Sequence, residues 1–206
     1  ARARVGDASP WPDDLRARAE QLLRQNGDDV LRLECRLASR GAASSWCLVT
    51  RRRSANAIVR LLPAIARRAP GSLPADLKAR PRPFYDQVLI EAQRGGADAG
   101  IALGDDGALL ETAHGNLWLL LDSVWTTPPL DGRILPGVAR DLLLSRARTN
   151  AVPVAERPLD LADLHRAEML VVSNAVHGPR QAALQGSDVA ECGSSLARLW
   201  RMIVAN

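Results

Sequence analysis

The pattern of apolar and polar positions predicts strands and helices in alternation along the chain. Apolar residues stand at every second position between Leu31 and Leu37, and charged residues fill the positions between them up to Arg36. This period of two is typical of a strand with one buried face, so we expect a strand at residues 31–38. Before it, residues 9–26 carry leucines and alanines at helical spacing, with Pro12 in the first turn and Gly27 after the end, and they predict a helix.

Short apolar runs separated by turn residues continue this alternation. We expect strands at residues 46–50, 58–62, 100–103, 108–111, 116–121, 124–126, 152–156 and 169–173. We expect helices at about 84–94, 138–149, 159–164 and 194–203, and Asp160 is expected to cap the third of them. The spacing within 54–68 could also suit a helix, but Pro63 would break one, so we expect a strand that ends at Leu62 and then a loop. The whole pattern predicts an α/β protein.

A segment rich in proline and glycine, Ala69 to Pro74, predicts the boundary between two lobes. A smaller N-terminal α/β lobe would cover residues 1–72, and a C-terminal lobe would cover residues 73–206. A chain of 206 residues suits one compact domain or two small lobes of this kind.

Composition narrows the classes of function. The formal net charge of +4 would permit nucleic-acid binding, but the arginines are scattered and aromatic residues make up only 3% of the chain. A solvated basic surface that attracts a small anionic substrate is therefore the better interpretation, and we expect no nucleic-acid partner. No apolar run approaches the ~20 residues of a membrane-spanning helix, so no membrane partner is expected. The three cysteines and three histidines show no metal-binding or pairing spacing, which indicates reduced thiols in a cytoplasmic protein and no metal.

Three features carry candidate chemistry. Lys78 is the only lysine among 27 lysine and arginine residues; a reactive amine is the one task that arginine cannot perform, because arginine does not deprotonate. Its alternative interpretation is an exposed loop residue. Glu111 is the only charged residue between Leu109 and Leu121, so it needs a partner if it is buried, and a salt bridge to an arginine is the plainer alternative. Residues 135–137, Leu-Pro-Gly, lead into a predicted helix, which is a common backbone setting for a phosphate.

The order of several motifs resembles a known family. The segments Lys78-Ala-Arg-Pro-Arg-Pro-Phe-Tyr85-Asp86, Glu-Thr-Ala-His-Gly-Asn-Leu-Trp at 111–118, Thr-Thr-Pro-Pro-Leu at 126–130 and Ile-Leu-Pro-Gly-Val-Ala-Arg at 134–140 occur in this order. Together they are similar to the fold-type IV, or class IV aminotransferase-like, pyridoxal-phosphate enzymes, which include branched-chain and D-amino-acid aminotransferases and aminodeoxychorismate lyase. The resemblance runs from about Asp13 to the C-terminus, and it implies a two-lobed D-amino-acid aminotransferase-like fold.

The resemblance implies roles for the residues that hold the cofactor ring. Lys78 would bind pyridoxal 5'-phosphate covalently and move the substrate proton. Tyr85 would hydrogen-bond the phenolate oxygen, and Glu111 would keep the pyridine nitrogen protonated so that the ring accepts electrons. Asn116 would fix the adjacent turn. Tyr85 could otherwise be a core residue of its helix.

Further residues are implied for the phosphate and the substrate. The amides of Val138 and Ala139 would bind phosphate at a helix start, although relatives often carry threonine where Ala139 stands. Residues 173–175, Ser173, Asn174 and Ala175, would form the second phosphate-side loop, and Asn174-Ala175 resembles the lyases. Arg40 is a candidate for a substrate carboxylate, and a solvated charge at a strand end is an equal alternative.

We expect the activity of aminodeoxychorismate lyase, which makes 4-aminobenzoate and pyruvate for folate biosynthesis. The alternatives are a class IV aminotransferase acting on branched-chain or D-amino acids, and a degenerate protein of this fold without turnover. The resemblance also implies a homodimer. Relatives carry strands before the first residue of this chain, so we expect that the N-terminus lacks them.

Overall fold

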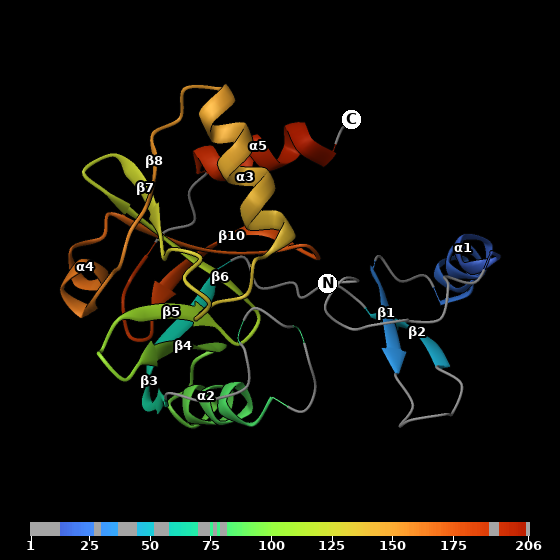
Figure 1. Ribbon diagram of the computed structural model, residues 1–206, viewed down its shortest axis with the longest axis horizontal. Coiled ribbons are helices and arrows are strands. Elements are labelled where there is room, and N and C mark those ends of the chain that lie inside the picture. Colours follow the sequence, from blue (N-terminus) through green and yellow to red (C-terminus); the bar gives the residue numbers. More distant parts are fainter. Residues whose placement is uncertain are drawn as a thin grey trace. The chain divides into compact units, whose positions relative to one another are not determined.

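The computed structural model describes residues 13–26, 30–36, 45–51, 58–69, 75, 78, 82–189 and 194–204. It divides into two compact units, residues 1–55 and 56–206 (Figure 1). The sequence placed the boundary near residue 72, after the strand that begins at Ile58. The division lies before that strand because the strand is hydrogen-bonded on both edges within the second unit.

The first unit holds one helix and two strands. Helix α1 spans Leu15–Asn26, and strands β1 (Val30–Arg36) and β2 (Ser45–Arg51) pair antiparallel from Val30 opposite Arg51 to Arg36 opposite Ser45. Helix α1 contacts both strands. The predicted helix and both predicted strands are confirmed. The bounds of the strands differ from the predicted ones by a few residues, and the helix begins six residues later than predicted. Arg40, the candidate for a substrate carboxylate, lies outside the described residues.

The second unit is built on an eight-stranded mixed sheet in the order β5-β4-β3-β10-β9-β6-β7-β8. The strands are β3 (Val59–Arg68), β4 (Ala99–Gly104), β5 (Leu109–Thr112), β6 (Gly115–Leu121), β7 (Val124–Thr127), β8 (Val154–Glu156), β9 (Met169–Asn174) and β10 (Gly178–Leu184). Strand β5 also pairs with β6. Because β5 therefore has a partner on both edges, six of the strands close into a ring, and β7 and β8 extend the sheet beyond it.

Alternation of side chains separates an interior from two outer surfaces. The cluster inside the ring comprises residues from all six strands, among them Leu61, Ile101, Leu119 and Val172. The neighbouring positions in sequence point outward: Ala102 and Leu110 pack with helix α2 (Pro83–Arg94), while Trp118 and Val171 pack with α3 (Val138–Thr149) and α5 (Ser195–Val204). Figure 1 shows α2 on one side of the sheet and α3 with α5 on another.

One sequence-based expectation for the second unit was wrong, and one strand was missed. Strand β3 does not end at Leu62; it continues through Pro63 to Arg68, with a register shift against β4 between Pro63 and Arg67. A proline is tolerated in a strand at such an irregularity, because no ladder hydrogen bond is required of its missing N–H. Strand β10, which pairs with both β3 and β9, was not predicted.

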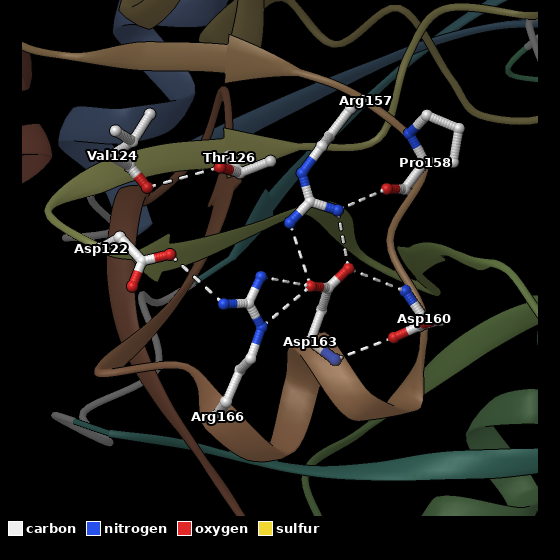
Figure 2. A network of polar contacts seen from close by, with 8 residues as sticks. All are labelled: Asp122, Val124, Thr126, Arg157, Pro158, Asp160, Asp163 and Arg166. Atoms are coloured by element: carbon white, nitrogen blue, oxygen red, sulfur yellow. Dashed lines mark hydrogen bonds and ion pairs between the residues drawn. The ribbon is translucent and has the colours of Figure 1, made fainter.

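The carboxylate of Asp163 connects helix α4 (Leu161–Arg166) to the edge of the sheet (Figure 2). Asp163 accepts hydrogen bonds from Arg157 at 2.7 and 3.0 Å and from Arg166 at 2.9 and 3.2 Å. It also forms a capping box with Asp160, the predicted cap. Arg166 reaches further to Asp122 in the β6–β7 turn. This network joins α4, the segment after β8 and the β6–β7 turn.

Candidate active site

Glu111, near the end of β5, is the centre of a buried polar cluster. The residue is only 2% exposed. Tyr85 on helix α2 donates its hydroxyl proton to Oε1 over 2.5 Å, and the backbone N–H of Leu135 donates to the same oxygen over 3.2 Å. The amide of Asn116 on β6 donates to Oε2 over 3.2 Å. Three parts of the chain far apart in sequence therefore meet at one carboxylate.

Two guanidinium groups flank the tyrosine of this cluster. The Cζ atom of Arg82 lies 4.0 Å from the centroid of the Tyr85 ring, and the Cζ atom of Arg68 lies 5.9 Å from it. Arg82 also approaches Oε1 of Glu111, at 4.0 Å. The positive charge over the ring face is attracted by the ring quadrupole. The arrangement places positive charge beside a buried acid without a direct hydrogen bond between Arg82 and Glu111.

The environment shifts the proton affinities of both acidic groups. Burial raises the pKa of Glu111 to about 7, and the hydrogen bonds from Tyr85 and Leu135 and the charges of Arg82 and Arg68 oppose this shift. Burial, and then the neighbouring Glu111, raises the pKa of the Tyr85 hydroxyl above its ordinary value. Tyr85 is therefore a neutral hydrogen-bond donor near pH 7, and Glu111 is poised between its charged and neutral forms.

Helix α3 begins in the loop that contacts this cluster. Leu135 bonds both Glu111 and Asn116, and Gly137 is the N-cap residue of α3. Val138, the first helical residue, is 64% exposed, and Ala139 is buried. The first N–H groups of a helix have no partner within the helix, so they form a setting for an anion. The start of α3 and the buried acid are thus adjacent.

The residues predicted to form the second phosphate-side loop have structural contacts of their own. The hydroxyl of Ser173 accepts a hydrogen bond from the Trp118 indole N–H over 2.9 Å. The Asn174 side chain accepts from the backbone N–H groups of Val176 and His177 and donates to the carbonyl of His114. Ala175 is exposed. Asn174 therefore ties the β9–β10 turn to the β5–β6 turn, and a phosphate contact by this loop stays a prediction.

Lys78 lies in the connection between β3 and α2, and its side chain is exposed. The covalent role that the sequence predicts for it stays a prediction. Sequence reasoning missed that Arg82 and Arg68 both lie close to the Tyr85 ring. The spacing of Arg82 and Tyr85, one helical turn apart, was the available signal.

Two further properties concern the part of the chain that the structure describes. No helix there is long and apolar enough to cross a membrane. Among those same residues no group of three or more His, Cys, Asp or Glu side chains is arranged to hold a metal ion.

Comparison with solved structures identifies the fold. Branched-chain amino acid aminotransferase of Escherichia coli superposes with a TM-score of 0.75 at 23% identity, over 96% of this chain and 71% of that one. A Legionella pneumophila protein to which 4-amino-4-deoxychorismate lyase activity is attributed superposes with a TM-score of 0.74 at 21% identity, over 90% of this chain and 73% of that one. Identities this low support the shared fold alone.

Comparison of sequences identifies the family. The branched-chain-amino-acid aminotransferase of Escherichia coli is 34% identical over 109 residues, which are 52% of this chain and 35% of the relative. The matched segment thus spans about a third of the length of the curated relative. A family model described as amino-transferase class IV matches residues 5–183. The chain therefore belongs to the class IV aminotransferase family.

Proposed function

We propose that this chain forms part of a pyridoxal-phosphate enzyme that acts as an aminodeoxychorismate lyase, producing 4-aminobenzoate and pyruvate. The observation that carries the cofactor assignment is the buried pair of Tyr85 and Glu111 beside the start of helix α3. Membership of the class IV family supports the same assignment.

The residues fit the three polar parts of the proposed cofactor. A pyridine nitrogen requires an acid, and Glu111 is a buried acid with a pKa of about 7. A ring oxygen requires a neutral donor, and the Tyr85 hydroxyl is one. A phosphate requires N–H groups, and the exposed Val138 begins a helix in the same loop that bonds Glu111. Tyr85 has one proton to donate, so it would exchange its present acceptor, Glu111, for the ring oxygen.

When bound, pyridoxal phosphate accepts the electron pair that remains on a substrate carbon after a proton is removed. Glu111 would hold a proton at the ring nitrogen, and the adjacent positive charge would favour its carboxylate form. The Tyr85 hydroxyl would orient the ring, and the amides of Val138 and Ala139 would bind the phosphate. Lys78 would take the proton from the carbon that bears the substrate nitrogen.

The lyase reaction balances without a second substrate. The substrate carbon that bears nitrogen loses a proton, the bond from the substrate ring to the enolpyruvyl oxygen breaks, and the substrate ring becomes aromatic. The released three-carbon group takes up a proton on carbon and leaves as pyruvate. The lyase is preferred over a transaminase because the Lys78–Tyr85–Asp86 spacing and Ser173–Asn174–Ala175 resemble lyases of the family. In this structure the side-chain amide of Asn174 holds the β9–β10 turn and the β5–β6 turn together.

A branched-chain aminotransferase is the second candidate, because the curated relative with 34% identity has that name. It would share every step up to proton removal but would then need a 2-oxo acid as a second substrate. The two reactions can therefore be distinguished, because only the aminotransferase needs an added 2-oxo acid.

The test is to offer aminodeoxychorismate alone to the protein loaded with pyridoxal phosphate. We expect pyruvate and 4-aminobenzoate in equal amounts over many turnovers without any 2-oxo acid. Leucine or D-alanine offered alone should convert the cofactor to its amine form only slowly. Rapid conversion by leucine together with no pyruvate from aminodeoxychorismate would reject the lyase and support the aminotransferase.

A further inference from the structure

The two oxygens of Glu111 have separate donors. Tyr85 and the Leu135 N–H both contact Oε1, whereas Oε2 accepts from the side-chain amide of Asn116 over 3.2 Å. Rotation of the carboxylate about its last bond would break contacts at both oxygens. Asn116 therefore determines the direction of the oxygen that Tyr85 and Leu135 do not hold.

The same amide also holds the loop before helix α3. Nδ2 of Asn116 donates to the carbonyl of Leu135 over 2.9 Å, and the N–H of Leu135 returns to Glu111. Glu111, Asn116 and Leu135 thus form a closed circuit of hydrogen bonds. Asn116 is 3% exposed, so water cannot readily replace its amide. Its backbone is fixed as well, because it lies opposite Glu111 on one side and Ser173 on the other.

Gly137 makes room for this amide. A Cβ atom at position 137 would lie 2.0 Å from Oδ1 of Asn116, far inside van der Waals contact. The backbone of Gly137 has φ −71° and ψ 132°, which any residue can adopt, so the requirement for glycine is steric. The N-cap of α3 consequently has no side-chain cap, although Ser, Thr, Asp or Asn is usually preferred there.

We propose that Asn116 is a positioning residue that orients the Glu111 carboxylate and locks it to the loop from which helix α3 starts. This inference rests on the proposed function, in which Glu111 binds the ring nitrogen and α3 binds the phosphate. One amide would then fix the separation between the site for the ring nitrogen and the site for the phosphate.

The contribution of Asn116 to the orientation of Glu111 can be measured through the pKa of the Glu111 carboxyl group. The charges of Arg68 on β3 and of Arg82, the N-cap residue of α2, act on the carboxylate, and the Tyr85 hydroxyl on α2 donates to it. Asn116 on β6 and Leu135 in the loop before α3 are its other, neutral donors. Removal of the Asn116 amide leaves Oε2 buried without its donor. Because a hydrogen bond to the charged form favours that form, its loss raises the pKa of the carboxyl group.

The first experiment measures the pKa of Glu111 in cofactor-free protein by carbon-13 NMR of labelled glutamate, with Glu111→Gln to assign the signal. Asn116→Ala and Asn116→Asp should each raise this pKa by about one pH unit or more, since alanine removes the donor and an ionised aspartate replaces it with a negative charge. Asn150→Ala is the matched control, because Asn150 is exposed at the other end of α3 and its side chain donates only to the backbone carbonyl of Arg146 among the contacts described. An unchanged pKa in both Asn116 variants would overturn the proposal.

The second experiment is a double-mutant cycle of thermal unfolding on the same cofactor-free protein. Gly137→Ala alone should lower Tm and raise the pKa of Glu111, because the new methyl group displaces the Asn116 amide. In the Asn116→Ala background, Gly137→Ala should lower Tm much less. Pyridoxal phosphate should bind about tenfold more weakly to each single variant than to the wild-type protein. It should bind to the double variant no more weakly than to either single variant. Additive losses of Tm would overturn the proposal.

These readouts separate the inference from the proposed function. Both the pKa of Glu111 and the double-mutant cycle are measured without cofactor. Failure of either therefore rejects the role of Asn116, whereas failure of the wild-type protein to bind pyridoxal phosphate rejects the proposed function.

Discussion

At the scale of single residues, Glu111 combines burial with a charge that the proposed chemistry requires. Glu111→Gln should leave the cofactor bound but slow turnover by ~10²-fold or more, because a neutral amide cannot stabilise a protonated ring nitrogen. Steady-state kinetics on protein with measured cofactor occupancy will check this. Turnover near that of the wild-type protein would make Glu111 an ordinary structural acid.

The raised pKa of Glu111 also predicts how the stability of the cofactor-free protein varies with pH. The folded state binds a proton at this site more tightly than the unfolded chain, in which the group has its ordinary pKa near 4.5. Folding is therefore disfavoured progressively as pH rises from about 4.5 through about 7, by an amount on the order of 2–3 kcal/mol. Denaturant unfolding over this range should show the decline in wild-type protein and a shallower one in Glu111→Gln. Equal slopes in the two proteins would contradict the assigned pKa.

The sequence singled out Glu111, Tyr85 and Asn116 as separate candidates but could not show that they touch. A lone carboxylate in an apolar run is visible in sequence, and so is the need for a partner. Which partner it has depends on how α2 packs against the sheet and on the β5–β6 register, and neither is a local property. The contact of Arg82 with Tyr85 was open to prediction from their spacing, whereas the approach of Arg68 to the same ring depends on tertiary packing.

At the scale of elements, the carboxylate of Asp163 holds α4 in place. Asp163→Asn should lower the free energy of unfolding at pH 7 by about 1–3 kcal/mol, because two guanidinium groups lose a charged acceptor. Arg157 and Arg166 hold the pKa of Asp163 far below its usual range. The stabilisation is thus complete above the unfolded pKa near 4 and is lost as pH falls below it. Chemical denaturation at pH 7 and pH 3 should show a large difference between variant and wild type at pH 7 and a smaller one at pH 3.

A control for this prediction is Asp105→Asn in the exposed turn after β4. Its side chain accepts from the adjacent backbone N–H of Asp106, and its substitution should change stability by no more than ~0.5 kcal/mol. A loss for Asp163→Asn no larger than that of Asp105→Asn would show that the network in Figure 2 adds nothing to stability.

Elements with strong local signals were predicted well, and those fixed by tertiary contacts were not. Helix α3 begins at Val138 and ends at Thr149 as expected, because Leu-Pro-Gly and the following apolar spacing are local signals. Strand β10 escaped prediction because Gly178–Leu184 contains Pro179, Arg180 and Gln181 and shows no clear alternation. Its extended form comes from pairing with β3 and β9 on its two edges.

At the scale of the whole molecule, closure of the strand ring could not be predicted from sequence. The pairing of β5 with both β4 and β6 joins segments that are close in sequence, but the parallel pairings of β3 with β4 and β10 bring together distant ones. These pairings also place the start of α2 and the loop before α3 at the same carboxylate. The site is therefore a product of the closed sheet rather than of any single motif.

The most direct test of the proposed enzyme is covalent capture of pyridoxal phosphate on Lys78. Incubation with the cofactor and reduction with borohydride, followed by peptide mass spectrometry, should place a phosphopyridoxyl group on Lys78. Lys78→Arg keeps the charge but should carry no such group at residue 78, because a guanidinium does not deprotonate to a nucleophile. Absence of the group from Lys78 in the wild-type protein, or modification confined to the N-terminal amine in both proteins, would contradict the proposed enzyme.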